Sequence, residues 1–115
     1  MNKIIVYGIP NCDSVKKTLA WYHKKSIAVE LHDYKKVGIS KTKLAEWCKQ
    51  VGWQTLLNKK STTWRALPPE VQQKANNEQD AIDTMIANTS LIKRPVVEMN
   101  DKIIVGFNET YFSTQ

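Results

Sequence analysis

The sequence predicts an α/β fold in which a β-α-β unit, a mostly helical segment and a closing β-hairpin follow one another along the chain. Three patterns support this prediction. Residues 1–34 hold two short strand-like runs with a helical run between them. Residues 35–90 place apolar side chains at helical spacing, and after Arg94 two apolar runs flank a turn. We therefore expect one domain in the order β-α-β, helical segment, β-β, with a short segment at the end.

The β-α-β unit begins with residues 3–7 (KIIVY), a β-branched and aromatic run that predicts a buried strand ending at Gly8. From Asp13 to about Lys25, apolar residues recur at the spacing of an amphipathic helix. Residues 28–32 (AVELH) alternate as a second strand. Strands joined by such a short helical crossover are expected to be parallel, with a right-handed connection.

The middle of the chain is expected to be helical. Ser40 is a predicted N-cap for a helix that ends at Gly52. The apolar face of that helix comprises Leu44, Trp47, Cys48 and Val51. After a polar loop over residues 58–63, the Pro68-Pro69-Glu70 motif predicts the start of a short helix. A further helix is indicated by Ile82, Met85 and Ile86.

The last part of the chain returns to strands. Residues 95–99 and 103–105 flank the turn Asn100-Asp101, which predicts a β-hairpin, and Gly106 ends the second strand. A short end segment follows, with Tyr111 and Phe112. The sequence contains no repeat, linker or low-complexity tract, so we expect one domain over residues 1–115, with a helical insertion at about residues 35–90.

Composition limits the classes of protein. The chain has 115 residues, 42% of them hydrophobic, which suits one compact core. No apolar run reaches the roughly 18 residues of a membrane span, and the N-terminus has no signal-peptide pattern, so a soluble cytoplasmic protein without membrane contact is expected. Cys12 and Cys48 lack the spacings of a zinc site, and a cytoplasmic chain is not expected to be held by disulfides. We expect no metal and no bound cofactor.

The net charge of +6 favours an anionic partner, whether a small oxyanion, an acidic peptide or a nucleic acid. The lysines that produce this charge also serve to solvate helices. No nucleic-acid recognition motif and no basic stripe with interleaved aromatic residues is present, so direct nucleic-acid binding is not expected.

Cys12 is the main candidate for chemistry. It lies in "YGIPNCDSVKK", between a predicted strand and the first turn of a predicted helix. Free backbone N–H groups and the positive end of the helix dipole favour thiolate over thiol at such a position, and the thiolate is the nucleophile in redox chemistry. Ser14 offers a hydroxyl to the same space, and Asn11 is a further candidate for binding substrate or anion. The alternative is that Cys12 is an inert small residue in a turn.

Two other positions are assigned by pattern. Arg94 precedes Pro95 at the start of a predicted strand; the peptide bond between them is a candidate for the cis form, and the guanidinium is a candidate anion-binding group. A solvated loop arginine is the alternative. Cys48 lies on an apolar helix face, so core packing is its expected role.

Three motifs, "YGIPNCDSVKK", "LLNKKSTTWRAL" and "LIKRPVV", in this order and spacing resemble the arsenate reductase family, and most closely its branch of small arsenate-reductase-like proteins related to the Spx regulators. The resemblance implies a thioredoxin-like fold, βαβ then ββα with a helical insertion, and a cis proline at Pro95 close to Cys12. It also implies that Cys12 is the catalytic thiol and that Arg94 binds an oxyanion, lowers the thiol's affinity for its proton, or does both. Glutaredoxin-coupled members attack arsenate with this cysteine, and glutathione resolves the adduct.

The chain departs from those reductases at two further arginines. Asn58 stands in the place of one, and "FNETYF" after Gly106 supplies none for the other. Arg65, in the "TTWR" stretch, is a candidate replacement. One cation in place of three disfavours turnover of an arsenate dianion, whereas a thiol-disulfide substrate needs less positive charge.

The preferred function is therefore that of a glutathione-dependent thiol reductase, which reduces an oxidised thiol or a small oxyanion with glutathione as co-substrate. An arsenate reductase is one alternative, and glutaredoxin is a candidate partner. The other alternative is a non-catalytic, Spx-like protein that binds RNA polymerase. Such regulators commonly switch through a Cys-x-x-Cys pair, and Val15 occupies the second cysteine position, which excludes a switch of that type.

Overall fold

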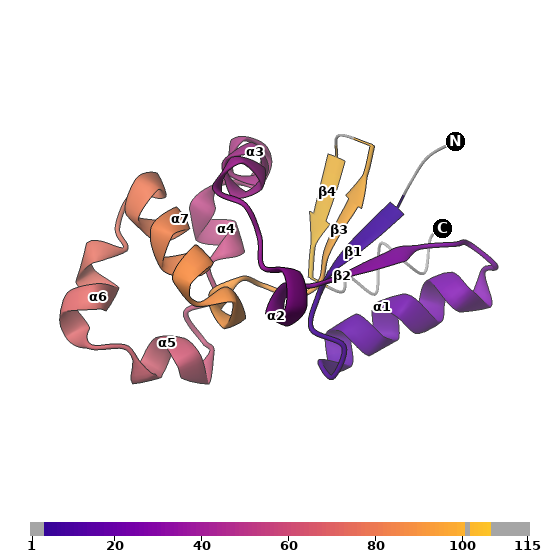
Figure 1. The fold of residues 1–115 in the computed structure, drawn as a ribbon, viewed down its shortest axis with the longest axis horizontal. Coiled ribbons are helices and arrows are strands. Elements are labelled where there is room, and N and C mark those ends of the chain that lie inside the picture. Colours follow the sequence, from indigo (N-terminus) through magenta and orange to yellow (C-terminus); the bar gives the residue numbers. More distant parts are fainter. Residues whose placement is uncertain (1–3, 101, 107–115) are drawn as a thin grey trace. The chain divides into compact units, whose positions relative to one another are not determined.

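The computed structural model describes residues 4–100 and 102–106, and the chain falls into two compact units. The first is formed by the described parts of Met1–Val37 and Arg94–Gln115, and the second by Gly38–Lys93. Each unit has its own set of elements (Figure 1) and is described by itself. The expectation of one domain over residues 1–115 stays a prediction.

A four-stranded sheet forms the first unit, with strand order β2-β1-β3-β4 (Figure 1). Its strands are β1 (Ile4–Gly8), β2 (Glu30–Asp33), β3 (Val96–Met99) and β4 (Lys102–Val105). β1 pairs in parallel with β2, and the β1–β3 and β3–β4 pairs are antiparallel. The predicted β-α-β unit and the closing hairpin are both confirmed, and they join into one mixed sheet.

The second strand begins later than the sequence pattern indicates. It starts at Glu30, whereas alternation predicted residues 28–32. The helix before it ends at Lys24, and the chain then reverses through Ser26, which has a φ of 58°. The Ile27 N–H donates to the Tyr22 carbonyl at 2.9 Å, so this part of the chain is still tied to the helix and is not free to join the ladder.

The helix α1 (Asp13–Lys24) supplies the core on one face of the sheet. Val15 and Tyr22 from the helix pack with Val6 of β1 and Val97 of β3, and all four are almost fully buried. Alternation along the strands puts Tyr7 and Val96 on the opposite face. Cys12 is partly buried and packs against this cluster of four residues. The start of α1 is therefore held by the packing of the helix body on the sheet.

The turn of the β3–β4 hairpin contains a residue in the left-handed region, Asn100, with a φ of 56°. Gly106, directly after β4, has a φ of 83°, a conformation that glycine adopts at no steric cost. The predicted end segment with Tyr111 and Phe112, and the final helix implied by the family resemblance, lie outside the described residues.

The second unit is helical, as predicted, with caps that match the sequence signals. Its elements are α3 (Lys41–Val51), α4 (Trp53–Leu56), α5 (Thr62–Ala66), α6 (Pro69–Lys74), α7 (Glu78–Ala87) and the 3₁₀ turn η1 (Thr89–Leu91). The Ser40 hydroxyl accepts a hydrogen bond from the Lys43 N–H at 3.1 Å, which confirms the predicted N-cap. The fully buried side chains of the second unit include Leu44, Trp47, Leu56, Met85, Leu91 and Ile92.

One predicted loop in the second unit is partly helical. Residues 58–63 were expected to be a polar loop, but α5 begins at Thr62 because Ser61 caps it, accepting from the Trp64 N–H at 3.1 Å. None of the helices in the described part of the chain is both long and apolar enough to cross a membrane.

Candidate active site at the carboxyl edge of the sheet

Cys12 is the N-cap residue of α1, with an extended backbone (φ −86°, ψ 130°). Its N–H donates to the Ile9 carbonyl at 3.0 Å, and its carbonyl accepts from the Lys16 N–H at 2.9 Å. The backbone is thus fixed on both sides. The thiol makes no capping hydrogen bond, and the side chain is half-buried and free of any disulfide. The loop holds the Cys12 backbone and leaves the sulfur available for chemistry.

Gly8 explains how the loop before Cys12 fits onto the helix. A Cβ built at Gly8 would lie 2.5 Å from Cγ2 of Val15, a distance that real side chains do not tolerate. Val15 is fully buried in the core. The close approach of β1 and α1, which sets the path from strand to cysteine, therefore requires a residue without a side chain at position 8.

The neighbours of Cys12 in the sequence share the same junction. Asn11 is exposed in the turn before the helix, and Ser14 is half-buried in the first helical turn. The Thr18 hydroxyl donates to the Ser14 carbonyl at 2.8 Å. Asp13 is exposed and lies in the first turn, where a carboxylate interacts favourably with the helix dipole.

Arg94 and Pro95 lie at the same edge of the sheet, directly before β3. In the ladder, Gly8 pairs with Asp33, Tyr7 with Val96, and Val96 with Val105. The carboxyl ends of β1, β2 and β4 therefore meet the amino end of β3. Pro95 is buried, and its carbonyl accepts from the Gly106 N–H at 2.7 Å. The Arg94–Pro95 peptide bond is cis.

This register brings five of the predicted site residues to one edge of the first unit. They are Asn11, Cys12, Ser14, Arg94 and Pro95. Arg65 belongs to α5 in the second unit, where its side chain is exposed, so its predicted role in anion binding stays a prediction.

A row of aromatic residues next to this edge was not predicted to belong to the site. The ring centroid of Tyr7 lies 4.7 Å from that of His32 and 6.3 Å from that of Tyr34, and the Tyr7 hydroxyl donates to Glu98 at 3.2 Å. Tyr34 opens the short helix α2 (Tyr34–Val37), directly after β2. The signal that could have identified it is its position, one residue past the end of a strand parallel to β1.

Cys48 has the structural role predicted for it. It lies on α3 in the second unit and is 5% exposed. The pKa of the Cys48 thiol is raised to about 11. Burial is the main cause, and the nearby Glu78 carboxylate acts in the same direction. At neutral pH this thiol stays protonated, which makes it a poor nucleophile.

The raised pKa of Cys48 gives a pH-dependent prediction. Between the ordinary thiol value and about 11, the folded protein keeps a proton that the unfolded chain releases, so the free energy of unfolding should fall as the pH rises through this window. Denaturant titrations from pH 8 to 11 should show a steeper fall for the wild type than for Cys48→Ala. Equal slopes for the two proteins would contradict this prediction.

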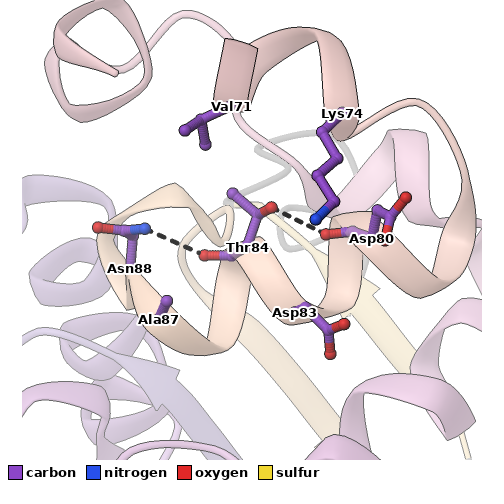
Figure 2. A pocket seen from close by; sticks show the side chains of 7 residues that line it. All are labelled: Val71, Lys74, Asp80, Asp83, Thr84, Ala87 and Asn88. Atoms are coloured by element: carbon purple, nitrogen blue, oxygen red, sulfur yellow. Dashed lines mark hydrogen bonds between the residues drawn. The ribbon is translucent and has the colours of Figure 1, made fainter. Parts of the chain in front are cut away.

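A pocket of about 280 Å³ lies within the second unit, between α6 and α7 (Figure 2). It is lined by Val71, Lys74, Asp80, Asp83, Thr84, Ala87 and Asn88. The Thr84 hydroxyl donates to the Asp80 carbonyl, and the Asn88 amide donates to the Thr84 carbonyl. Asp83 pairs with Lys41 at 3.4 Å. The two hydrogen bonds lie within α7 and its C-terminal end, and the ion pair joins α7 to Lys41 of α3, so several of the polar groups that line the pocket are engaged in the fold.

Among the described residues, no three His, Cys, Asp or Glu side chains gather in a way that could hold a metal ion. The first unit holds a free, half-buried thiol at the start of α1, and Arg94 and Pro95 lie at the same edge of its sheet. The mixed four-stranded sheet with α1 packed on one face is the architecture of a thioredoxin-like fold.

The sequence pattern of the ArsC family matches residues 7–114, and the chain belongs to this family. A Haemophilus influenzae protein described as uncharacterized is 42% identical over 106 residues, 92% of both chains. The solved structure of an arsenate reductase (ArsC) related protein from Brucella melitensis is 38% identical, has a TM-score of 0.77, and covers 97% of this chain and 92% of its own. The structure of a protein named YFFB is 42% identical with a TM-score of 0.90, and the match covers 97% of each chain.

Regulators are also among the relatives. The global transcriptional regulator Spx of Streptococcus pyogenes is 26% identical over 108 residues, which are 92% of this chain and 79% of the regulator. The arsenate-reductase-like, thioredoxin-like fold predicted from the three motifs is confirmed by the family match and by these structures.

Proposed function

We propose that this protein is a glutathione-dependent thiol reductase that works through the single nucleophile Cys12. One observation carries the proposal: the half-buried Cys12 thiol caps no amide at the start of α1, and the position three residues on is the fully buried Val15. A reductase with one cysteine at this place cannot close an internal disulfide in the Cys-x-x-Cys manner. It needs an external thiol, and glutathione is the simplest small thiol for that step.

The proposed cycle has two exchange steps. The Cys12 thiolate attacks the glutathione sulfur of a glutathionylated substrate, the substrate S–S bond breaks, and the substrate leaves as a thiolate that takes a proton from water. The product is a mixed disulfide between Cys12 and glutathione. A second glutathione thiolate attacks the glutathione sulfur of that disulfide, which releases oxidised glutathione and regenerates the Cys12 thiolate. In the net reaction one reduced glutathione is consumed and one oxidised glutathione is formed for each substrate disulfide, so the incoming glutathione is the reductant.

Arg94 supports this chemistry by its position. It is half-buried and lies at the same sheet edge as Cys12. A guanidinium binds a carboxylate through two parallel hydrogen bonds, and glutathione carries two carboxylates. Asn11 and Ser14 supply polar side chains one residue before and two residues after Cys12 in the chain. A glutaredoxin is a further candidate for resolving the mixed disulfide.

Arsenate is the less favoured substrate. The Asn58 side-chain oxygen accepts from the Lys60 N–H at 3.1 Å, so this residue builds a turn in the second unit and brings no charge. Among the described residues of the first unit Arg94 is the arginine, so a dianion bound there would be held by one guanidinium. Several positive groups are usually needed to stabilise such a charge.

The test is incubation of the reduced protein with oxidised glutathione, followed by peptide mass mapping. We expect one added glutathione, on Cys12, removed again by excess reduced glutathione, and no adduct on the buried Cys48. An adduct on Cys48 alone, or none on either cysteine, would contradict the proposal.

A polymerase-binding protein is the second candidate, favoured by the likeness to Spx regulators over 92% of the chain. The positive net charge of +6 suits an acidic partner surface. Binding of the purified protein to purified RNA polymerase, with no glutathione adduct on Cys12, would favour this function over the reductase.

A further inference from the structure

Tyr34 has a hydroxyl that the fold itself does not use. The residue is 1% exposed, and its oxygen is buried with no hydrogen-bond partner among the residues that the structure describes. Leaving a buried hydroxyl unpaired is unfavourable, and most buried polar groups in proteins do find a partner. By contrast, the hydroxyl of its neighbour Tyr7 donates to Glu98. Of these two neighbouring tyrosines, only Tyr34 has a hydroxyl without a hydrogen-bond partner in the described part of the chain.

The position of Tyr34 relates it to the candidate site. It follows β2 directly, Cys12 follows β1 after a short loop, and Arg94 lies just before β3. β2 and β3 flank β1 on its two sides, and the register brings these three ends to one edge. Three segments far apart in the sequence thus place Cys12, Arg94 and Tyr34 at the same edge of the first unit.

Arg94 and Tyr34 also act on each other electrostatically. Burial raises the pKa of Tyr34 well above its ordinary value, the neighbouring Tyr7 adds to this, and the positive charge of Arg94 opposes it. The guanidinium is thus close enough for its charge to reach the phenol. Because the pKa is raised, the hydroxyl stays protonated and keeps its hydrogen for donation at neutral pH.

We propose that the Tyr34 hydroxyl donates a hydrogen bond to the anionic oxygen that Arg94 binds, so that the two residues hold one acceptor together. This inference rests on the proposed function and adds a substrate-binding residue to it. The acceptor is an oxygen with negative charge, either a glutathione carboxylate or an oxygen of a small oxyanion. A guanidinium has only hydrogen-bond donors, so Arg94 cannot accept the hydrogen of the Tyr34 hydroxyl. An anionic oxygen between the two side chains can accept hydrogen bonds from both.

In the free protein the hydroxyl is covered, so an arriving anion has to displace side chains at the edge. Changes of side-chain rotamer are common when a ligand binds, even where the backbone stays fixed. Pairing a previously unpaired hydroxyl with a charged acceptor offsets the cost of that movement.

The experiment measures binding without chemistry, by calorimetry with two probes, S-methylglutathione and inorganic sulfate. For S-methylglutathione, Tyr34→Phe should raise the Kd about tenfold, because a hydrogen bond to a charged group is lost. The melting temperature of the Tyr34→Phe protein should be unchanged or higher than that of the wild type, because an unpaired buried hydroxyl is removed. Arg94→Ala should also weaken binding. Tyr22→Phe, the same change in the core under α1, should leave the Kd as in the wild type.

The two probes distinguish the source of the anionic oxygen. A loss confined to S-methylglutathione supports a carboxylate, and a loss for both probes supports a general oxyanion site. If Tyr34→Phe binds both probes like the wild type while Arg94→Ala does not, the hydroxyl is satisfied elsewhere, for example by an interior water, and this inference is wrong while the proposed function stands. If the wild type binds neither probe, the anion site of the proposed function fails and this inference fails with it.

Discussion

Cys12→Ser is expected to reduce the turnover of a glutathionylated peptide at least about a hundredfold, because a serine hydroxyl forms no thiolate and no mixed disulfide. The residue is half-buried and its side chain makes no capping bond, so the change from sulfur to oxygen should leave the fold intact. The rate is followed as oxidised glutathione formed, with glutathione reductase and NADPH as the coupled readout. Circular dichroism shows whether the variant is folded.

The matched control for this experiment is Cys48→Ser. Cys48 is buried on α3 with a pKa raised to about 11, so it takes no part in the proposed cycle. We expect its variant, if folded, to turn over the peptide within about twofold of the wild type. Loss of turnover in a folded Cys48→Ser protein would make Cys48 the resolving thiol. Retained turnover in Cys12→Ser would remove Cys12 as the nucleophile.

Gly8→Ala is expected to destabilise the protein by about 1–3 kcal/mol, the range seen when a packed core is overfilled. The added methyl would meet Cγ2 of Val15 at 2.5 Å, and Val15 is fully buried with a stiff, β-branched side chain. Either the loop toward Cys12 or the start of α1 has to move. Urea unfolding followed by tryptophan fluorescence measures the change.

A second substitution tests the cause of this effect. Val15→Ala removes the methyl groups that the new side chain would meet, so the double variant Gly8→Ala/Val15→Ala should be more stable than the sum of the two single changes predicts. A control is available at Gly38, where a built Cβ meets nothing within 4 Å but φ is +73°. Gly38→Asn, an amino acid that tolerates this φ, should cost little. Additive effects of Gly8→Ala and Val15→Ala would show that the contact is not the reason.

The parts of the fold that sequence patterns predicted well are those with long apolar periodicity or a clear cap. The helix after Ser40 was predicted with its cap and its stop at Gly52, because eleven residues give several turns of pattern. The β-α-β unit was predicted because a strand, a helix and a second strand differ in period. The short helices α2, α4 and α5 were not predicted, since four or five residues hold little more than one turn.

The candidate site was predicted in part. Cys12 is recognisable from its neighbours in sequence, and Arg94-Pro95 from the motif that contains them. Tyr34 was missed because no local pattern marks it. Its relation to Cys12 depends on β1 and β2 being parallel and in a register that pairs Gly8 with Asp33, which periodicity alone does not give.

The pairing of β1 with β3 joins segments from opposite ends of the chain, and this has a consequence during synthesis. The ribosome releases Cys12 about 80 residues before Arg94, which at roughly 5–20 residues per second is an interval of several seconds. Throughout that time the nascent chain carries the thiol without the arginine, the cis proline or the hairpin that complete the sheet edge. The proposed site is therefore assembled only after the last strands have been translated.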